Sequence, residues 1–167
     1  MPIYAKALKL FCYIPEAIVV GLACLTFVGI RPAMKKMTLF GVIYGCTIFL
    51  CRDLIVPFFG WAFGIHTVML VILNMIFLKI LFSLNIAVAL ICAFLYFTIL
   101  FLIEPLTLIL FNFMGIPTSK ILGSALNSFL CNCCTLAFVS AIIYLLRKKN
   151  YTLLPIAKMI RTEKDEQ

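Results

Sequence analysis

Five long apolar stretches, joined by short links, occupy almost all of the 167 residues of this chain. The hydrocarbon core of a bilayer is about 30 Å thick, and a helix needs about 20 apolar residues to cross it. Hydrophobic residues make up 65% of the chain and charged residues 12%, whereas a soluble domain is about half apolar and a quarter charged. The apolar runs are continuous rather than alternating, which favours helices over a β-barrel. The sequence therefore predicts an all-α, polytopic integral membrane protein, a bundle of about five transmembrane helices.

The predicted spans form one transmembrane domain over residues 1–149 and leave a short basic tail over residues 150–167. The spans cover residues 10–30, 38–57, 65–84, 85–113 and 121–146. The fourth is over-long and is interrupted by Glu104-Pro105, which predicts a kink or a tilt. Gly41 and Gly45 lie one helical turn apart and predict close packing of another helix, with packing inside the chain favoured over a dimer seam.

The distribution of basic residues predicts that the N-terminus lies outside and the C-terminus in the cytoplasm. This N-out/C-in arrangement leaves four basic residues outside, namely Lys6, Lys9, Arg52 and Lys120. The other ten lie inside: Arg31, Lys35, Lys36, Lys79, Arg147, Lys148, Lys149, Lys158, Arg161 and Lys164. Short cytoplasmic loops carry such an excess of Lys and Arg. We therefore expect a multi-pass protein of the cell membrane.

The basic tail is predicted to contact the bilayer surface. Its residues 153–161 alternate apolar and basic side chains, a pattern typical of a segment that lies on a membrane. Five cations are expected to face the anionic lipids of the inner leaflet: Arg147, Lys148, Lys149, Lys158 and Arg161. The chain has no surface with interleaved basic and aromatic residues, so we expect no binding of nucleic acid.

All eight cysteines fall inside apolar stretches. A free cysteine packs as a small hydrophobe, and we expect that role here. Cys131 and Cys134 share one helical face, but His and carboxylate residues that would complete a metal site are missing nearby in sequence. The sequence predicts no metal site and no cofactor.

A few charged residues lie inside or at the ends of the predicted spans, and each needs a reason. A charged side chain near the bilayer centre costs about 2.5–3.5 kcal/mol on insertion scales. The candidates gather on the predicted outer side: Glu16, Arg52, Asp53, His66 and Glu104. Glu16 and Glu104 each adjoin a proline, and a proline frees a backbone carbonyl one turn back. One hypothesis is an outward-facing pocket in which these residues bind a ligand. The alternative is a satisfied network, with Arg52 paired to Glu16 or Glu104 and His66 among the lipid headgroups.

Catalytic motifs are not evident in the sequence. Asp53 and His66 lie in different segments, and no serine sits in a nucleophile motif. The glycine pairs lack the spacing of a phosphate-binding loop. We therefore predict a protein that is not an enzyme.

Several short motifs resemble a known group of receptors. They are Tyr13-Ile-Pro-Glu16, Gly29-Ile-Arg31-Pro32, Phe63-Gly-Ile-His66-Thr67 and Glu104-Pro105 followed by Phe113-Met-Gly115. Over residues 8–146 the chain resembles the N-terminal multi-span membrane region of Gram-positive, clostridial-type sensor histidine kinases with a GHKL ATPase domain, which are related to the accessory gene regulator receptors.

The resemblance implies a membrane region that perceives a peptide or envelope signal. It does not imply kinase activity, since only eighteen residues follow Lys149 and none of them is a histidine. It implies instead a sensor-like module that acts through a separate kinase, with Glu16, His66 and Glu104 as sensing or structural residues.

Three functions remain open from the sequence. The first is a non-enzymatic membrane sensor or regulatory module that perceives an extracytoplasmic or in-membrane signal and acts through a cytoplasmic partner. The second is a small transport component, such as a substrate-binding subunit. The third is an assembly or structural protein that packs against partners.

Overall fold

The computed structural model describes residues 3–59, 65–118 and 125–149, and these residues form helices and no strands. The helices are α1 (Ile3–Phe27), α2 (Met34–Phe49), η1 (Leu50–Ile55), α3 (Val56–Phe59), α4 (Ile65–Phe82), α5 (Ile86–Phe113) and α7 (Ala125–Lys148). Five helical segments are long and apolar enough to cross a membrane, with α2 and η1 forming one of them. The prediction of an all-α chain with five long apolar helices is confirmed.

The boundaries differ from the predicted spans mainly at the first helix, which begins at Ile3 and ends at Phe27. It ends there because Gly29 adopts a φ of 85°, a conformation that glycine reaches without steric cost. The Ile30 N–H then bonds the Leu25 carbonyl at 2.7 Å, and the Gly29 N–H bonds the Thr26 carbonyl at 3.0 Å. This pair of bonds is the Schellman motif, which satisfies carbonyls at a helix end.

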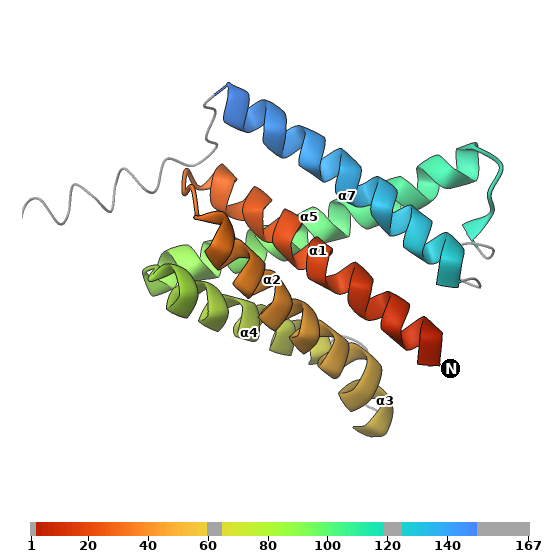
Figure 1. The fold of residues 1–167 in the computed structure, drawn as a ribbon, viewed down its shortest axis with the longest axis horizontal. Coiled ribbons are helices and arrows are strands. Elements are labelled where there is room, and N and C mark those ends of the chain that lie inside the picture. Colours follow the sequence, from red (N-terminus) through yellow and green to blue (C-terminus); the bar gives the residue numbers. More distant parts are fainter. Residues whose placement is uncertain (1–2, 60–64, 119–124, 150–167) are drawn as a thin grey trace, which may run out of the picture.

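Successive long helices run in opposite directions, with α1 in the middle of the bundle. Figure 1 shows α1 between α2 and α7, with α5 behind it. The rings of Phe40 and Phe82 lie 6.0 Å apart, so the start of α2 meets the end of α4. Arg147 Nε donates to Thr26 Oγ1 at 3.4 Å, so α7 ends beside the end of α1. One end of the bundle therefore collects the ends of α1, α4 and α7 and the starts of α2 and α5.

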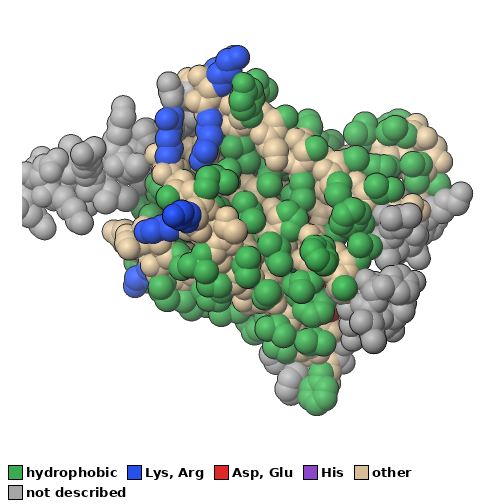
Figure 2. All heavy atoms as spheres, in the orientation of Figure 1, with side chains coloured by type: hydrophobic (Ala, Val, Ile, Leu, Met, Phe, Trp, Pro, Cys, Tyr) green, Lys and Arg blue, Asp and Glu red, His purple; other side chains and the backbone are tan. Residues whose placement is uncertain are grey.

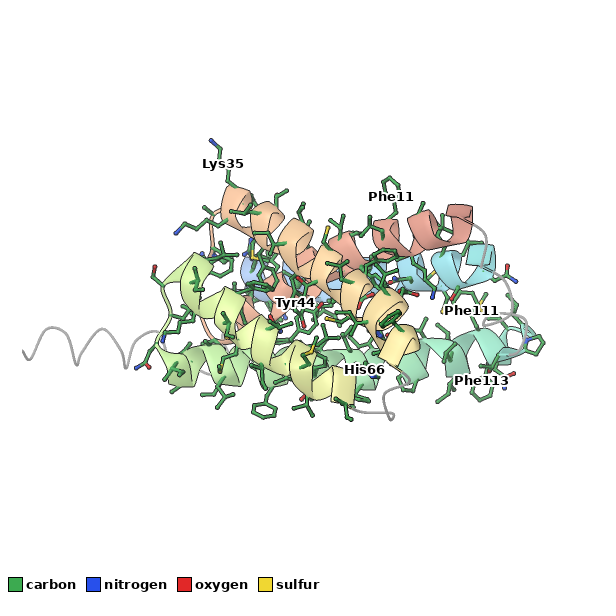
Figure 3. The ribbon with its side chains drawn as sticks, turned by 90° about the horizontal axis from the view of Figure 1, so that it is seen from below. Phe11, Lys35, Tyr44, His66, Phe111 and Phe113 are labelled. Atoms are coloured by element: carbon green, nitrogen blue, oxygen red, sulfur yellow. The ribbon has the colours of Figure 1, made fainter. Side chains whose placement is uncertain are left out.

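The interior formed by α1, α2, α4 and α5 is closely packed. Tyr44 of α2 is fully buried at its centre and points into the bundle (Figure 3). Its ring lies 5.4 Å from the rings of Phe40 and Tyr96, and its hydroxyl donates to the Leu70 carbonyl at 3.1 Å. Aromatic pairs at such distances stabilise a core beyond the area they bury.

Glycines set the distance between α1 and α2. A Cβ atom added at Gly41 would lie 2.1 Å from Ile18 Cγ1, and one added at Gly45 would lie 2.8 Å from Ile14 Cα. At Gly21 of α1 the nearest atom would be Phe40 Cε1, at 2.8 Å. The predicted close approach is confirmed, and the neighbouring helix belongs to the same chain.

The end of α2 changes its winding where it carries two charged residues. Leu50–Ile55 forms a π-helical stretch, in which the Val56 N–H bonds the Cys51 carbonyl five residues back. Such stretches are rare and occur often at functional sites. This one carries Arg52 and Asp53.

The fourth long helix runs through Pro105 without a break. A proline ring has no N–H to donate, so the carbonyl of Phe101, four residues back, loses its helical partner. At about 1.5 Å per residue its 28 residues span about 42 Å, which is longer than the bilayer core. Phe113 at its far end is exposed (Figure 3).

Candidate functional site

A cavity of about 520 Å³ lies on the other side of α1, where α1, η1, α5 and α7 surround it. Its apolar lining includes Ile103 and Leu108 of α5 and Leu136 and Val139 of α7. It lies toward the end of the bundle at which α1 begins and α5 ends. Binding sites for small molecules have about this size and often lie between helices of a bundle.

Four of the five predicted site residues line this cavity: Glu16, Arg52, Asp53 and Glu104. His66 does not line it. It lies at the start of α4 (Figure 3), and α4 packs against α2, η1 and α5 rather than against α7. The structure thus brings together residues from three predicted spans, and ligand binding by them stays a prediction.

Asp53 is neutralised within the chain. Lys9 Nζ lies 2.5 Å from Asp53 Oδ1, and the Tyr13 hydroxyl donates to Asp53 Oδ2 at 3.1 Å. The Lys9 side chain is 38% exposed and the Asp53 side chain 10%. This ion pair ties the start of α1 to η1 at the edge of the cavity.

Glu16 is the most deeply placed charged residue of the site, with 6% of its surface exposed. Asn132 of α7 donates from Nδ2 to Glu16 Oε2 at 3.3 Å. Arg52 and Glu104 line the same cavity as Glu16. Within the described part of the chain, the ion pair recorded is that of Lys9 with Asp53, and neither Glu16 nor Glu104 lies within 4.0 Å of Arg52. The alternative network, with Arg52 paired to one of these glutamates, is not observed.

A second polar contact joins α5 and α7 at the cavity wall. The Thr135 hydroxyl donates to Thr107 Oγ1 at 3.0 Å, and the Thr107 hydroxyl donates to the Ile103 carbonyl at 2.8 Å. Hydrogen bonds of this kind hold helices together in membranes, where apolar surface alone gives little driving force. Together with the bond from Asn132, this contact fixes α7 against the bundle.

Sequence reasoning left several lining residues out of the predicted pocket: Lys9, Cys12, Tyr13, Ser128, Asn132 and Thr135. Lys9 was used only to predict the orientation of the chain in the membrane, although it lies seven residues before Glu16. Side chains three or four residues apart share a helical face, so the spacing of Lys9, Tyr13 and Glu16 predicts one common face. The spacing of Ser128, Asn132 and Thr135 does the same for the last helix.

The described residues offer little else for chemistry. They contain no group of three or more His, Cys, Asp or Glu side chains placed to hold a metal ion. All eight cysteines are free thiols, and Cys133 and Cys134 are exposed on α7. What the arrangement can do is surround a small molecule with apolar walls and present two carboxylates and a guanidinium to it.

Comparison with known proteins gives no further guide. No protein-family model, curated protein or solved structure matches the chain.

Proposed function

We propose that this chain is a non-enzymatic sensor or regulatory module of the cell membrane, with an N-out/C-in topology. It binds a small ligand in the cavity between α1, η1, α5 and α7 and acts through a separate cytoplasmic partner. The observation that carries the proposal is the cavity itself, with Glu16 buried at its wall. Burying a charge in an apolar environment is costly unless the charge is paired. Binding of a ligand gives a reason for the burial of Glu16.

The charge distribution over the bundle supports this topology. Figure 2 shows Lys and Arg side chains gathered at one end of the visible face and hydrophobic side chains over the rest. This end carries Arg31, Lys35, Lys36, Lys79, Arg147, Lys148 and Lys149. The positive-inside rule makes it the cytoplasmic end, so the cavity lies toward the outer face.

The last helix, α7, offers a route from the cavity to the cytoplasm. Its first half lines the cavity through Asn132 and Thr135, and its last turn carries Arg147 and Lys148 at the opposite end. A ligand that displaces the Glu16–Asn132 contact would change the balance of contacts that hold α7. Such a change shifts the position of the end of α7 that carries Arg147 and Lys148, provided that the ligand binds one position of α7 more tightly than the other.

The partner class follows from the sequence resemblance, which implies a separate kinase.

The test is affinity purification of the tagged chain from native membranes in a mild detergent, with mass spectrometry of proteins and small molecules. We expect a signalling protein in near-stoichiometric amount. We also expect Glu16→Gln and Glu104→Gln to alter signalling while the protein stays in the membrane at normal level. Loss of both variants from the membrane would assign these residues a structural role only.

A transport component is the second candidate, and the metabolite-sized cavity is the observation that favours it. The same purification separates the two: an ATPase subunit and a retained metabolite would support transport. An assembly protein is less well supported, because the glycines of α1 and α2 that would serve a partner are already covered by residues of the neighbouring helix in the same chain.

A further inference from the structure

We propose that the ligand of this cavity is a monovalent organic cation with an apolar body, held by the carboxylate of Glu16 with Glu104 as a second acceptor. This inference rests on the proposed function and adds the chemical class of the ligand. Four observations carry it: the balance of charge in the cavity, the burial of Glu16, its open hydrogen-bonding capacity and the apolar walls.

The first observation is the balance of charge. Five charged side chains line the cavity: Lys9, Arg52, Glu16, Asp53 and Glu104. Lys9 and Asp53 cancel each other through their ion pair. With both carboxylates ionised, the remaining guanidinium and two carboxylates sum to −1, and a ligand of charge +1 brings the site to neutrality. An anionic ligand would add a charge beside two carboxylates, which is costly in a site partly removed from water.

The second observation is the placement of Glu16. The Glu16 residue is 94% buried and lines the cavity. Glu104 of α5 lines the same cavity, and two carboxylates that share a site repel each other. A cation that contacts both carboxylates converts this repulsion into two attractions.

The third observation is the hydrogen bonding of Glu16. An ionised carboxylate has about four lone-pair sites, and the structure records one hydrogen bond to it among the described residues, from Asn132 Nδ2. The remaining lone pairs can accept from the N–H groups of an ammonium ion. Hydrogen bonds to charged groups are stronger than neutral ones.

The fourth observation concerns the apolar part of the lining. Ile99, Leu100 and Ile103 of α5 and Phe129, Leu136 and Val139 of α7 line the cavity. These side chains give no partner to a polar ligand body. A cationic head with an apolar body therefore fits the combination of carboxylates and apolar walls that this site offers.

The test uses three probes with the same body and different heads: 4-phenylbutylammonium, 4-phenylbutanol and 4-phenylbutyrate. Binding to the full chain in phosphatidylcholine nanodiscs is measured by calorimetry, with empty nanodiscs to subtract partition into lipid. We expect the ammonium probe to bind at least about tenfold more tightly than the alcohol, because one charged hydrogen bond is worth more than that factor. The carboxylate probe should bind most weakly.

Variants of the chain test whether the preference for the ammonium probe arises in the cavity. Glu16→Gln should reduce the preference for the ammonium probe to about threefold or less, and Glu163→Gln, which removes one negative charge from the tail, should keep it. Where Glu16→Gln does not give a monodisperse protein, Glu104→Gln replaces it, since Glu104 is exposed and its amide variant preserves the shape.

The outcomes separate the two proposals. Saturable binding of the alcohol or the carboxylate at equal or higher affinity would overturn the ligand class and leave a ligand-binding cavity. A preference for the ammonium probe that survives both Glu16→Gln and Glu104→Gln would place the cation elsewhere and overturn the inference as well. If none of the three probes binds, both the ligand class and the proposed cavity function are contradicted.

Discussion

The two faces of α1 differ in almost every physical respect. Toward α2, Gly21 and Ala17 let side chains of the neighbouring helix pack tightly. Toward α5 and α7, Lys9, Tyr13 and Glu16 face a cavity of about 520 Å³. The first face joins a core that extends through four helices, whereas the second is backed by a small cluster of Ala23, Val139 and Ile143 with their neighbours.

This difference shows that the two faces of α1 have different sources of stability. A closely packed interior resists changes in volume, because side chains interdigitate with few voids. A hollow, charged interface between helices tolerates added volume and depends on polar contacts instead. The same helix therefore forms a closely packed face on one side and one wall of a cavity on the other.

The largest expected contrast comes from removing a side chain on each face. Tyr44→Ala should lower the free energy of unfolding by about 3–5 kcal/mol, since it leaves a large void among packed rings. Leu136→Ala, at the cavity wall, should cost less than about half as much, because its side chain already borders open space. Unfolding in bicelles, followed by circular dichroism, measures both. Equal losses would show that the two faces are packed alike.

Adding volume should sharpen the same comparison. Gly45→Ala places a methyl group against backbone atoms of Ile14 at 2.8–2.9 Å, so we expect a loss of about 1–3 kcal/mol. Leu136→Phe adds more atoms, but into the cavity, and should change stability by less than about 1 kcal/mol. Thermal unfolding in nanodiscs is the readout. A tolerated Gly45→Ala would argue against the tight α1–α2 contact.

The ion pair at the cavity edge should give a smaller effect. A double-mutant cycle of Lys9→Met and Asp53→Asn should report a coupling of about 1 kcal/mol, since the two groups are in contact but Lys9 is partly exposed. Additive effects of the two substitutions would mean that the pair does not tie α1 to η1 in the membrane.

The smallest effect concerns the hydroxyl contact between α5 and α7. Thr135→Val removes the hydrogen bond to Thr107, and such bonds in membranes contribute about 0.6 kcal/mol on average. A cycle with Thr107→Val isolates it in the same bicelle assay. A coupling well above about 2 kcal/mol would show that α7 is held more rigidly than a signal-transmitting helix requires.

The helices could be predicted from the sequence because their signal is local. Apolar runs of sufficient length mark all five, and Gly41 and Gly45 predicted the close approach of another helix to the second span. The first helix end was placed three residues late, at Ile30 instead of Phe27, because the apolar run continues past the Schellman motif at Gly29. A hydropathy profile does not detect the change in backbone φ at Gly29 that ends the helix.

The site could be predicted only in part, because it depends on how helices face each other. Rare charges in apolar surroundings pointed to Glu16, Arg52, Asp53 and Glu104. The partner of Asp53 lies 44 residues away in sequence, and its position depends on the packing of α1 against η1. The π-helical turn that carries Arg52 and Asp53 has no known local signature. His66 lies at the start of α4, which packs away from α7. The depth in the membrane that a sequence predicts for a residue does not tell which side of the helix bundle the residue faces.

The predicted contacts of the tail, including Lys158, Arg161 and Lys164, fall outside the described residues, as does Lys120. The predicted contact of the tail with the membrane surface stays a prediction, as does the side of the membrane on which each of these residues lies. The kink or tilt expected at Pro105 also stays a prediction.

The most direct test of the central claim asks whether the cavity is reached from outside the cell. Two variants each keep one cysteine, Cys12 at the cavity wall or Cys46 of α2, both of them partly exposed. Intact cells are treated with the membrane-impermeant cation 2-(trimethylammonium)ethyl methanethiosulfonate, and modification is followed by mass spectrometry. The account predicts rapid modification of Cys12 and little of Cys46. An unreactive Cys12, or one that reacts only in inside-out vesicles, would contradict an outward-facing site.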